Sequence, residues 1–192
     1  MLSPYLKMFA ALLLVSFGSN SLYLHAQGKP PIPRQLKCRV LGLFMPERER
    51  DLKDLLEKTG KFKLIALDFA KAELTVEFDS AQVWSGEKPN RYLELFNNEL
   101  RNGSRGSFSA KELIQTPADK LRWVEITVVG LDCKGCSFGA YRLIYELPGV
   151  ELATSNFKTG LIRAYIDPEK TSRAKLEEAL KKGGVDILPQ KQ

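Results

Sequence analysis

The sequence predicts an α+β protein that contains two βαββαβ units in tandem, the first of them degenerate. The main observation is an internal repeat, because residues 40–79 align with residues 128–167 without a gap, at an offset of 88 (128 − 40). Gly42 falls on Gly130 at this offset, and apolar positions largely agree across the block. A second observation is that apolar residues alternate in some segments and follow a helical spacing in others. Together these patterns indicate a duplicated structural unit.

The second unit has the clearer pattern. A strand is predicted over residues 123–129, because Val124, Ile126 and Val128 share one face. A helix is expected over residues 136–146, where apolar residues recur at helical spacing before Pro-Gly ends the segment. The other predicted elements are strands over 150–155 and 161–166, a helix from the N-cap Ser172 to about residue 182, and a short last strand over 185–188.

The first unit repeats this order with an insertion. Its predicted elements are strands over 36–41, 62–69 and 73–78 and helices over 47–58 and 91–100. The inserted segment, residues 80–89, contains Trp84, for which we expect core packing in preference to contact with a partner. The sequence therefore predicts two ferredoxin-like βαββαβ domains in tandem.

The N-terminal segment has the features of a secretory signal peptide. Lys7 precedes a short apolar run over residues 8–17, and Leu24, His25 and Ala26 offer a small-residue cleavage site. The run is shorter than the about 20 residues that span a bilayer, so we favour a cleaved signal over an uncleaved membrane anchor. The prediction is a secreted or periplasmic protein with no stable membrane insertion after cleavage.

The predicted organisation has four segments. They are a signal peptide over residues 1–26, a degenerate domain over 35–108, a linker over 109–120 and a second domain over 121–190.

Charge and composition exclude several functional classes. The formal net charge of +6 falls to +5 when Lys7 is removed, and basic and acidic residues are well mixed. The chain has no dense basic run and no basic residues interleaved with aromatic ones, so nucleic-acid binding is not expected. The only histidine, His25, lies in the predicted signal. A mature chain without histidine cannot form a Ser-His-Asp triad or a Cys-His pair, and we expect no enzymatic activity.

The sequence of residues 130–136, GLDCKGC, carries the candidate chemistry. It places Cys133 and Cys136 three positions apart, where a predicted strand ends and a helix begins. Thiolates are soft ligands that select Cu(I), Zn(II) and similar ions, and the N-terminal end of a helix favours a negative charge. A CxxC pair alone is also found in redox motifs and in half zinc sites.

The residues that follow this motif narrow the interpretation. They are LPGV at 147–150, Asp167-Pro168 and KKGG at 181–184. With them, residues 121–189 resemble the heavy-metal-associated domain of copper chaperones, periplasmic mercury-binding proteins and metal-transporting P-type ATPases. The resemblance implies that Cys133 and Cys136 bind one soft metal ion per chain. It also implies that a metal transporter or another metal-binding protein is a possible partner.

The chain departs from the family pattern before the first cysteine. Leu131 and Asp132 stand where the family commonly has methionine and threonine. Leu131 keeps the apolar anchor of the loop, while Asp132 resembles the acidic residue of zinc-, cadmium- and lead-exporting ATPase domains. Asp132 is therefore a candidate third ligand for a divalent ion, or else a loop residue that bonds to local backbone or to water.

The first domain lacks an equivalent site. Met45 and Arg48 align with Cys133 and Cys136, and one thioether cannot replace two thiolates. Cys38 aligns with Ile126 on the inward face of its strand, so we expect it in the core. We interpret this domain as a scaffold or docking domain.

Three functional hypotheses follow. The leading one is an exported protein that binds a soft metal ion, Cu(I), Zn(II), Cd(II) or Hg(II), and passes it on by thiolate exchange. The second is an extracytoplasmic thiol–disulfide protein that uses the same cysteine pair. The third is an interaction module with a vestigial metal site.

Overall fold

The computed structural model describes residues 31–189, and the chain from Pro31 onwards forms one compact unit. The predicted signal peptide lies outside the described residues. No helix within residues 31–189 combines the length and the apolar character that crossing a membrane requires.

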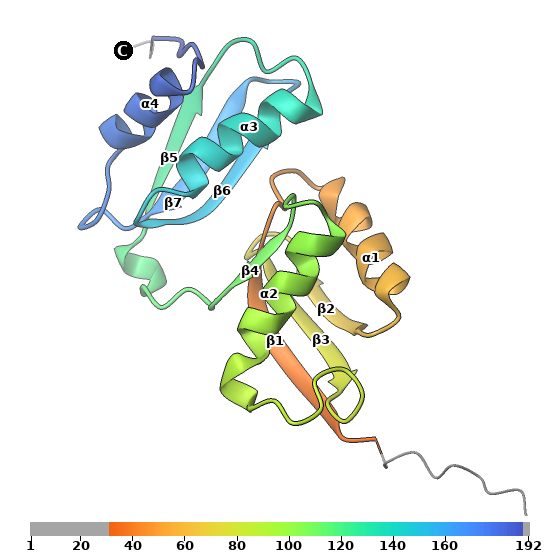
Figure 1. Ribbon diagram of the computed structural model, residues 1–192. Helices are drawn as coiled ribbons and strands as arrows, with labels where there is room; N and C mark the ends of the chain where they lie inside the picture. The colour runs from red at the N-terminus through yellow and green to blue at the C-terminus, as the bar shows by residue number, and fades with distance from the viewer. Residues whose placement is uncertain (1–30, 190–192) are drawn as a thin grey trace, which may run out of the picture. The chain divides into compact units, whose positions relative to one another are not determined.

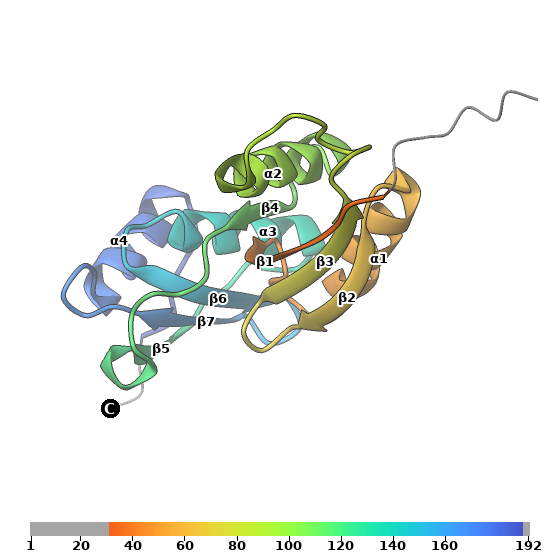
Figure 2. The same cartoon turned by 90° about the horizontal axis from the view of Figure 1, so that it is seen from below.

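The first domain is a four-stranded antiparallel sheet with two helices (Figures 1 and 2). The strands run in the order β2-β3-β1-β4 across the sheet, and a core of buried apolar side chains packs between the sheet and the helices. Its elements are β1 (Pro33–Leu41), α1 (Arg48–Thr59), β2 (Lys63–Asp68), β3 (Glu73–Asp79), α2 (Tyr92–Gly103) and β4 (Ser109–Lys111), with a short 3-10 helix, η1 (Pro89–Arg91), before α2.

The second domain repeats this arrangement with three strands in the order β5-β7-β6. Figure 1 shows α3 and α4 against the sheet, and the core of this domain lies between the sheet and the two helices. The elements are β5 (Arg122–Thr127), α3 (Lys134–Tyr145), β6 (Val150–Asn156), β7 (Leu161–Ile166) and α4 (Arg173–Lys182), after a 3-10 turn, η2 (Ala118–Lys120).

The predicted fold class is confirmed, because each domain has the βαββα order with an antiparallel sheet in matching strand order. The offset of 88 carries the start of β3 at residue 73 onto residue 161, where β7 begins. The first domain also contains the predicted insertion. Helix α4 begins at residue 173, which corresponds to residue 85, whereas α2 begins at residue 92.

Two elements differ from the sequence prediction. Residues 109–111, placed in the predicted linker, form β4 beside β1, where the Ala110 N–H donates to Oδ1 of Asn97 at 2.9 Å. This strand is too short for its apolar pattern to be recognised. The predicted last strand over 185–188 is reduced to a single bridge between Val128 and Ile187. It cannot extend far, because Pro189 follows and has no N–H to donate.

The predicted core positions of Cys38 and Trp84 are confirmed. Cys38 is fully buried on β1, and Trp84 is 8% exposed. Trp84 packs against Phe62, Phe78 and Tyr92 at ring-centroid distances of 4.7 to 5.5 Å. The inserted segment therefore contributes to the first domain's own core.

Candidate metal centre

The loop of residues 130–136 connects the end of β5 to α3 and is anchored by one apolar side chain. Gly130 begins the loop with φ of +80°, a conformation that glycine adopts readily. Leu131 is 5% exposed and belongs to the core of the second domain. The expectation that Leu131 serves as the apolar anchor of the loop is confirmed.

Cys133 is the N-cap residue of α3. Its backbone is extended, with φ −140° and ψ 160°, and its Sγ accepts a hydrogen bond from the Cys136 N–H at 3.1 Å. Cys136 lies in the first helical turn. Backbone N–H groups at a helix N-terminus have no partner within the helix, so they favour negative charge on a sulfur that lies there.

The structure brings the three predicted ligands together. Cys133 and Cys136 form a disulfide with a Cα–Cα distance of 5.2 Å, and Oδ1 of Asp132 lies 3.4 Å from Sγ of Cys136. The three donor atoms all lie within 4.8 Å of one another. Asp132 and Cys133 are exposed and Cys136 is half-buried. Once the disulfide is reduced, two thiolates and a carboxylate can face one ion from an exposed loop.

A hollow of about 470 Å³ opens beside Cys136. Much of its lining is glycine: Gly130, Gly139, Gly183 and Gly184. A Cβ atom added at Gly139 or at Gly184 would meet no neighbouring atom within 4 Å, whereas one added at Gly183 would clash with Leu143. This flank of the loop is open to an approaching ligand group.

The corresponding loop of the first domain has different chemistry. Met45 is 5% exposed and packs in an apolar cluster. Arg48 donates from Nε to the Gly42 carbonyl at 3.2 Å and from Nη2 to Oγ of Ser107 at 3.2 Å, and it also pairs with Asp51. Within residues 31–189, Asp132, Cys133 and Cys136 form the only group of three or more His, Cys, Asp or Glu side chains that lie close enough together to hold a metal ion.

Cys38 takes no part in the candidate centre. It is a free thiol, and desolvation by burial raises its pKa to about 12. A thiol of this kind is neither a nucleophile nor a metal ligand at neutral pH.

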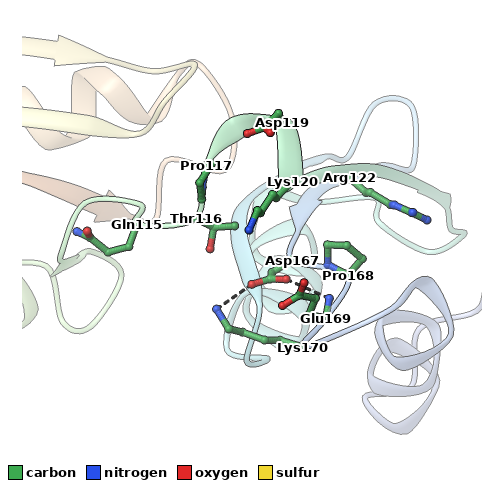
Figure 3. A pocket seen from close by; sticks show the side chains of 10 residues that line it. All are labelled: Gln115, Thr116, Pro117, Asp119, Lys120, Arg122, Asp167, Pro168, Glu169 and Lys170. Carbon is green, nitrogen blue, oxygen red and sulfur yellow. Dashed lines mark hydrogen bonds and ion pairs between the residues drawn. The ribbon is translucent and has the colours of Figure 1, made fainter.

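A second hollow, of about 540 Å³, is polar and has no soft donor (Figure 3). Inside it Asp167 forms an ion pair with Lys170 at 2.8 Å and accepts from the Glu169 N–H at 3.0 Å. These bonds lower the pKa of Asp167, with the Lys170 hydrogen bond as the largest cause. The carboxylate is thus engaged in stabilising the turn after β7.

The aromatic flank of α3 was not predicted from the sequence. Phe138, Tyr141 and Tyr145 lie at helical spacing, and the rings of Tyr141 and Tyr145 stack at 5.2 Å. Tyr141 and Tyr145 are each 4% exposed and face the first domain. The available signal was a second apolar stripe on this helix, beside the one that contains Ala140 and Ile144.

Similar solved structures include metal-binding proteins. The CopZ metallochaperone is 21% identical, with a TM-score of 0.34, and covers 35% of this chain and 100% of its own. Oxidized MerP from Ralstonia metallidurans CH34 is 26% identical, with a TM-score of 0.34, over 35% of this chain and 94% of its own. The N-terminal soluble domains of Bacillus subtilis CopA are 14% identical, with a TM-score of 0.33, over 83% of this chain and 95% of their own.

No protein-family profile matches the chain. No curated protein matches it either.

Proposed function

We propose that this protein is an exported carrier that holds one soft metal ion between Cys133 and Cys136 and passes it to a partner. The observation that supports this most directly is the cluster of two sulfurs and one carboxylate oxygen within 4.8 Å on an exposed loop. Exposure suits a carrier, because its cargo must also leave. The partner would be a metal transporter or another metal-binding protein.

The transfer is a ligand exchange. An incoming thiolate of the partner bonds to the ion, and then the bonds to Cys136 and Cys133 break in turn. The open hollow beside Cys136 gives such a group access. Each released thiolate takes up a proton or a new ion. No substrate bond is made or broken, and no oxidant is consumed.

Asp132 would tune the choice of metal. Cu(I) is satisfied by two thiolates, whereas Zn(II) takes four ligands and accepts carboxylate oxygen among them. An oxygen 3.4 Å from one of the sulfurs is close enough to join the coordination of a divalent ion after a small movement.

The test is an anaerobic titration of the reduced mature protein with Cu(I) and with Zn(II), each against a competing chelator. We expect one ion per chain, and we expect Cys133→Ser/Cys136→Ser to abolish it. Asp132→Asn preserves the shape of the side chain and should weaken Zn(II) at least several-fold more than Cu(I). Binding no tighter than that of the double serine variant would refute the carrier.

The disulfide itself supports a second candidate function, an extracytoplasmic thiol–disulfide protein. Cys133 and Cys136 are bonded to each other, and Cys133 is the more exposed of the two residues. An exposed disulfide at a helix N-terminus is open to attack by an external thiolate. Turnover in an insulin-reduction assay, lost in Cys133→Ser, would favour this function over the carrier.

A further inference from the structure

The first domain packs against the helix that carries the candidate metal ligands. Three of its residues, Leu41, Phe44 and Met45, form one apolar cluster with Tyr141 and Tyr145 of α3. Each of the five is between 3% and 8% exposed. Residues 42–48 are the counterpart of the loop of residues 130–136, and we call them the docking loop.

Directional bonds accompany this apolar contact. The Gly42 N–H donates to the Tyr141 hydroxyl at 3.0 Å, and both groups are buried. The Ser155 N–H of β6 donates to the Phe44 carbonyl at 2.9 Å. A buried backbone N–H without a partner is costly, so these bonds specify one arrangement of the docking loop on α3 and β6.

A nearby ion pair adds to the contact. Arg39 pairs with Glu151 of β6 at 2.8 Å, and 9% and 15% of the two side chains are exposed. Arg39 lies directly across from Lys111 in the sheet of the first domain. Adjacent like charges repel. The Glu151 carboxylate, which belongs to the second domain, offsets that repulsion.

Arg48 fixes the shape of the docking loop. It occupies the position that corresponds to Cys136, and it bonds back to the Gly42 carbonyl. Its guanidinium lies 4.2 Å from the ring centroid of Phe108 and 5.6 Å from that of Phe44. The second domain would close its loop with a metal ion, and the first domain closes the same loop with a cation of its own chain.

Helix α3 carries both the candidate metal ligands and the residues that contact the docking loop. Cys133 caps it and Cys136 lies in its first turn, while Tyr141 on a later turn accepts the bond from Gly42. Phe138 lies between them, with its ring 5.5 Å from that of Phe44. Ligands at the start of the helix and the docking loop along its flank therefore act on one rigid element.

We propose that the former metal loop of the first domain has become a docking surface for α3, and that metal occupancy of the second domain stabilises the first. The metal-dependent half of this proposal rests on the proposed function. A metal that binds the folded second domain lowers the population in which that domain is unfolded. The docking contacts exist only when both domains are folded. Bound metal should therefore raise the denaturant concentration at which the first domain loses them and unfolds.

The experiment uses Trp84 as the reporter of the first domain. Trp123→Phe leaves Trp84 as the only tryptophan, and phenylalanine keeps an aromatic ring beside Tyr165 at this position, which is 45% exposed. Urea unfolding of the reduced chain is followed by Trp84 emission without metal and with Zn(II) or Cu(I) alone. Leu180→Ala, in the core of the second domain, is added to make that domain the weaker of the two.

The expected result has three parts. Leu180→Ala lowers the urea midpoint reported by Trp84, and metal raises it again by an amount well outside the error of the fit. Phe44→Ala removes both responses while the chain still binds one ion. The matched control is Leu64→Ala, which alters packing within the first domain's own core and should lower the midpoint without removing either response.

The outcomes separate this proposal from the proposed function. The coupling is overturned if the chain binds one ion but neither Leu180→Ala nor bound metal changes the urea midpoint reported by Trp84. A midpoint that Leu180→Ala moves, in a chain that binds no metal, supports docking and refutes the carrier. Equal metal responses in Phe44→Ala and in its parent would show that the docking loop is not the connection.

Discussion

Leu131 anchors the loop of residues 130–136, so its truncation should affect folding and, under the proposed function, metal binding as well. The side chain is 5% exposed and packs in the core of the second domain. Replacing a buried leucine by alanine costs about 2 to 5 kcal/mol, depending on how far the site collapses. A surface loop can relax inward, so we expect Leu131→Ala to lower the free energy of unfolding by about 2 to 3 kcal/mol.

The effect on metal affinity has a separate origin. A loop without its anchor must be ordered when the ion binds, and fixing the backbone of one residue costs about 1 to 2 kcal/mol. Since about 1.4 kcal/mol corresponds to a tenfold change, the metal Kd should rise about tenfold or more. Urea unfolding followed by circular dichroism measures the first effect, and a chelator competition titration measures the second.

Leu131→Met is the matched control, because it nearly conserves volume and should cost less than about 1.5 kcal/mol. Its Kd should stay within about threefold of the parent value if the anchor is apolar bulk alone. The reasoning would be refuted by a Leu131→Ala chain that unfolds at the parent midpoint and binds metal with the parent Kd.

Three further predictions concern Arg48, the three cysteine thiols and Asp167. Arg48→Met should lower the free energy of unfolding by about 1.5 to 3 kcal/mol, because hydrogen bonds from a charged group are lost. The control Arg50→Met replaces an exposed side chain and should change the free energy of unfolding by less than about 0.5 kcal/mol. Equal losses in the two variants would contradict the role of Arg48 in fixing the docking loop. In the reduced native protein, an aromatic disulfide reagent should modify the thiols of Cys133 and Cys136 quickly. It should modify Cys38 only after denaturation, because burial raises the pKa of that thiol to about 12. Fast modification of all three thiols would contradict this prediction. Asp167→Asn should destabilise at neutral pH and progressively less as the pH falls below about 4, the ordinary carboxyl pKa. The lowered pKa from Lys170 gives stability that is present above that value and lost as the pH falls through the folded pKa; a cost that is the same at pH 7 and pH 3 would contradict the role of the charge.

The repeat and the local elements could be predicted because they depend on short-range patterns. The alternation of Val124, Ile126 and Val128 and the Pro-Gly after α3 specify a strand and a helix end without reference to the rest of the chain. The duplication then extended those assignments to the first domain. Elements without a pattern of their own, such as β4 with its three residues, could not be recognised in this way.

The ligand cluster could be predicted in part. The spacing of Cys133 and Cys136 was sufficient to place both sulfurs at one helix N-terminus. The place of Asp132 depends on the loop conformation after Gly130, and the sequence left its role open. The structure places Oδ1 of Asp132 3.4 Å from Sγ of Cys136.

The docking of the first domain on α3 could not be predicted from the sequence. Arg39 and Glu151 are 112 positions apart, and Gly42 and Tyr141 are 99 apart. Such pairs depend on the complementarity of two finished surfaces, which no local pattern encodes. The absence of cysteines from the first loop was visible in the sequence, but the contacts that this loop makes with α3 were not.

Strand β6 lies at the edge of its sheet, and two of its backbone groups bond to the first domain. The Ser155 N–H bonds to Phe44, and the Glu151 carbonyl accepts from Arg39. A bare strand edge is a template on which another chain can pair and begin to aggregate. In this protein two backbone groups along that edge already bond to the first domain, so a strand of another chain could pair with them only after these bonds had broken.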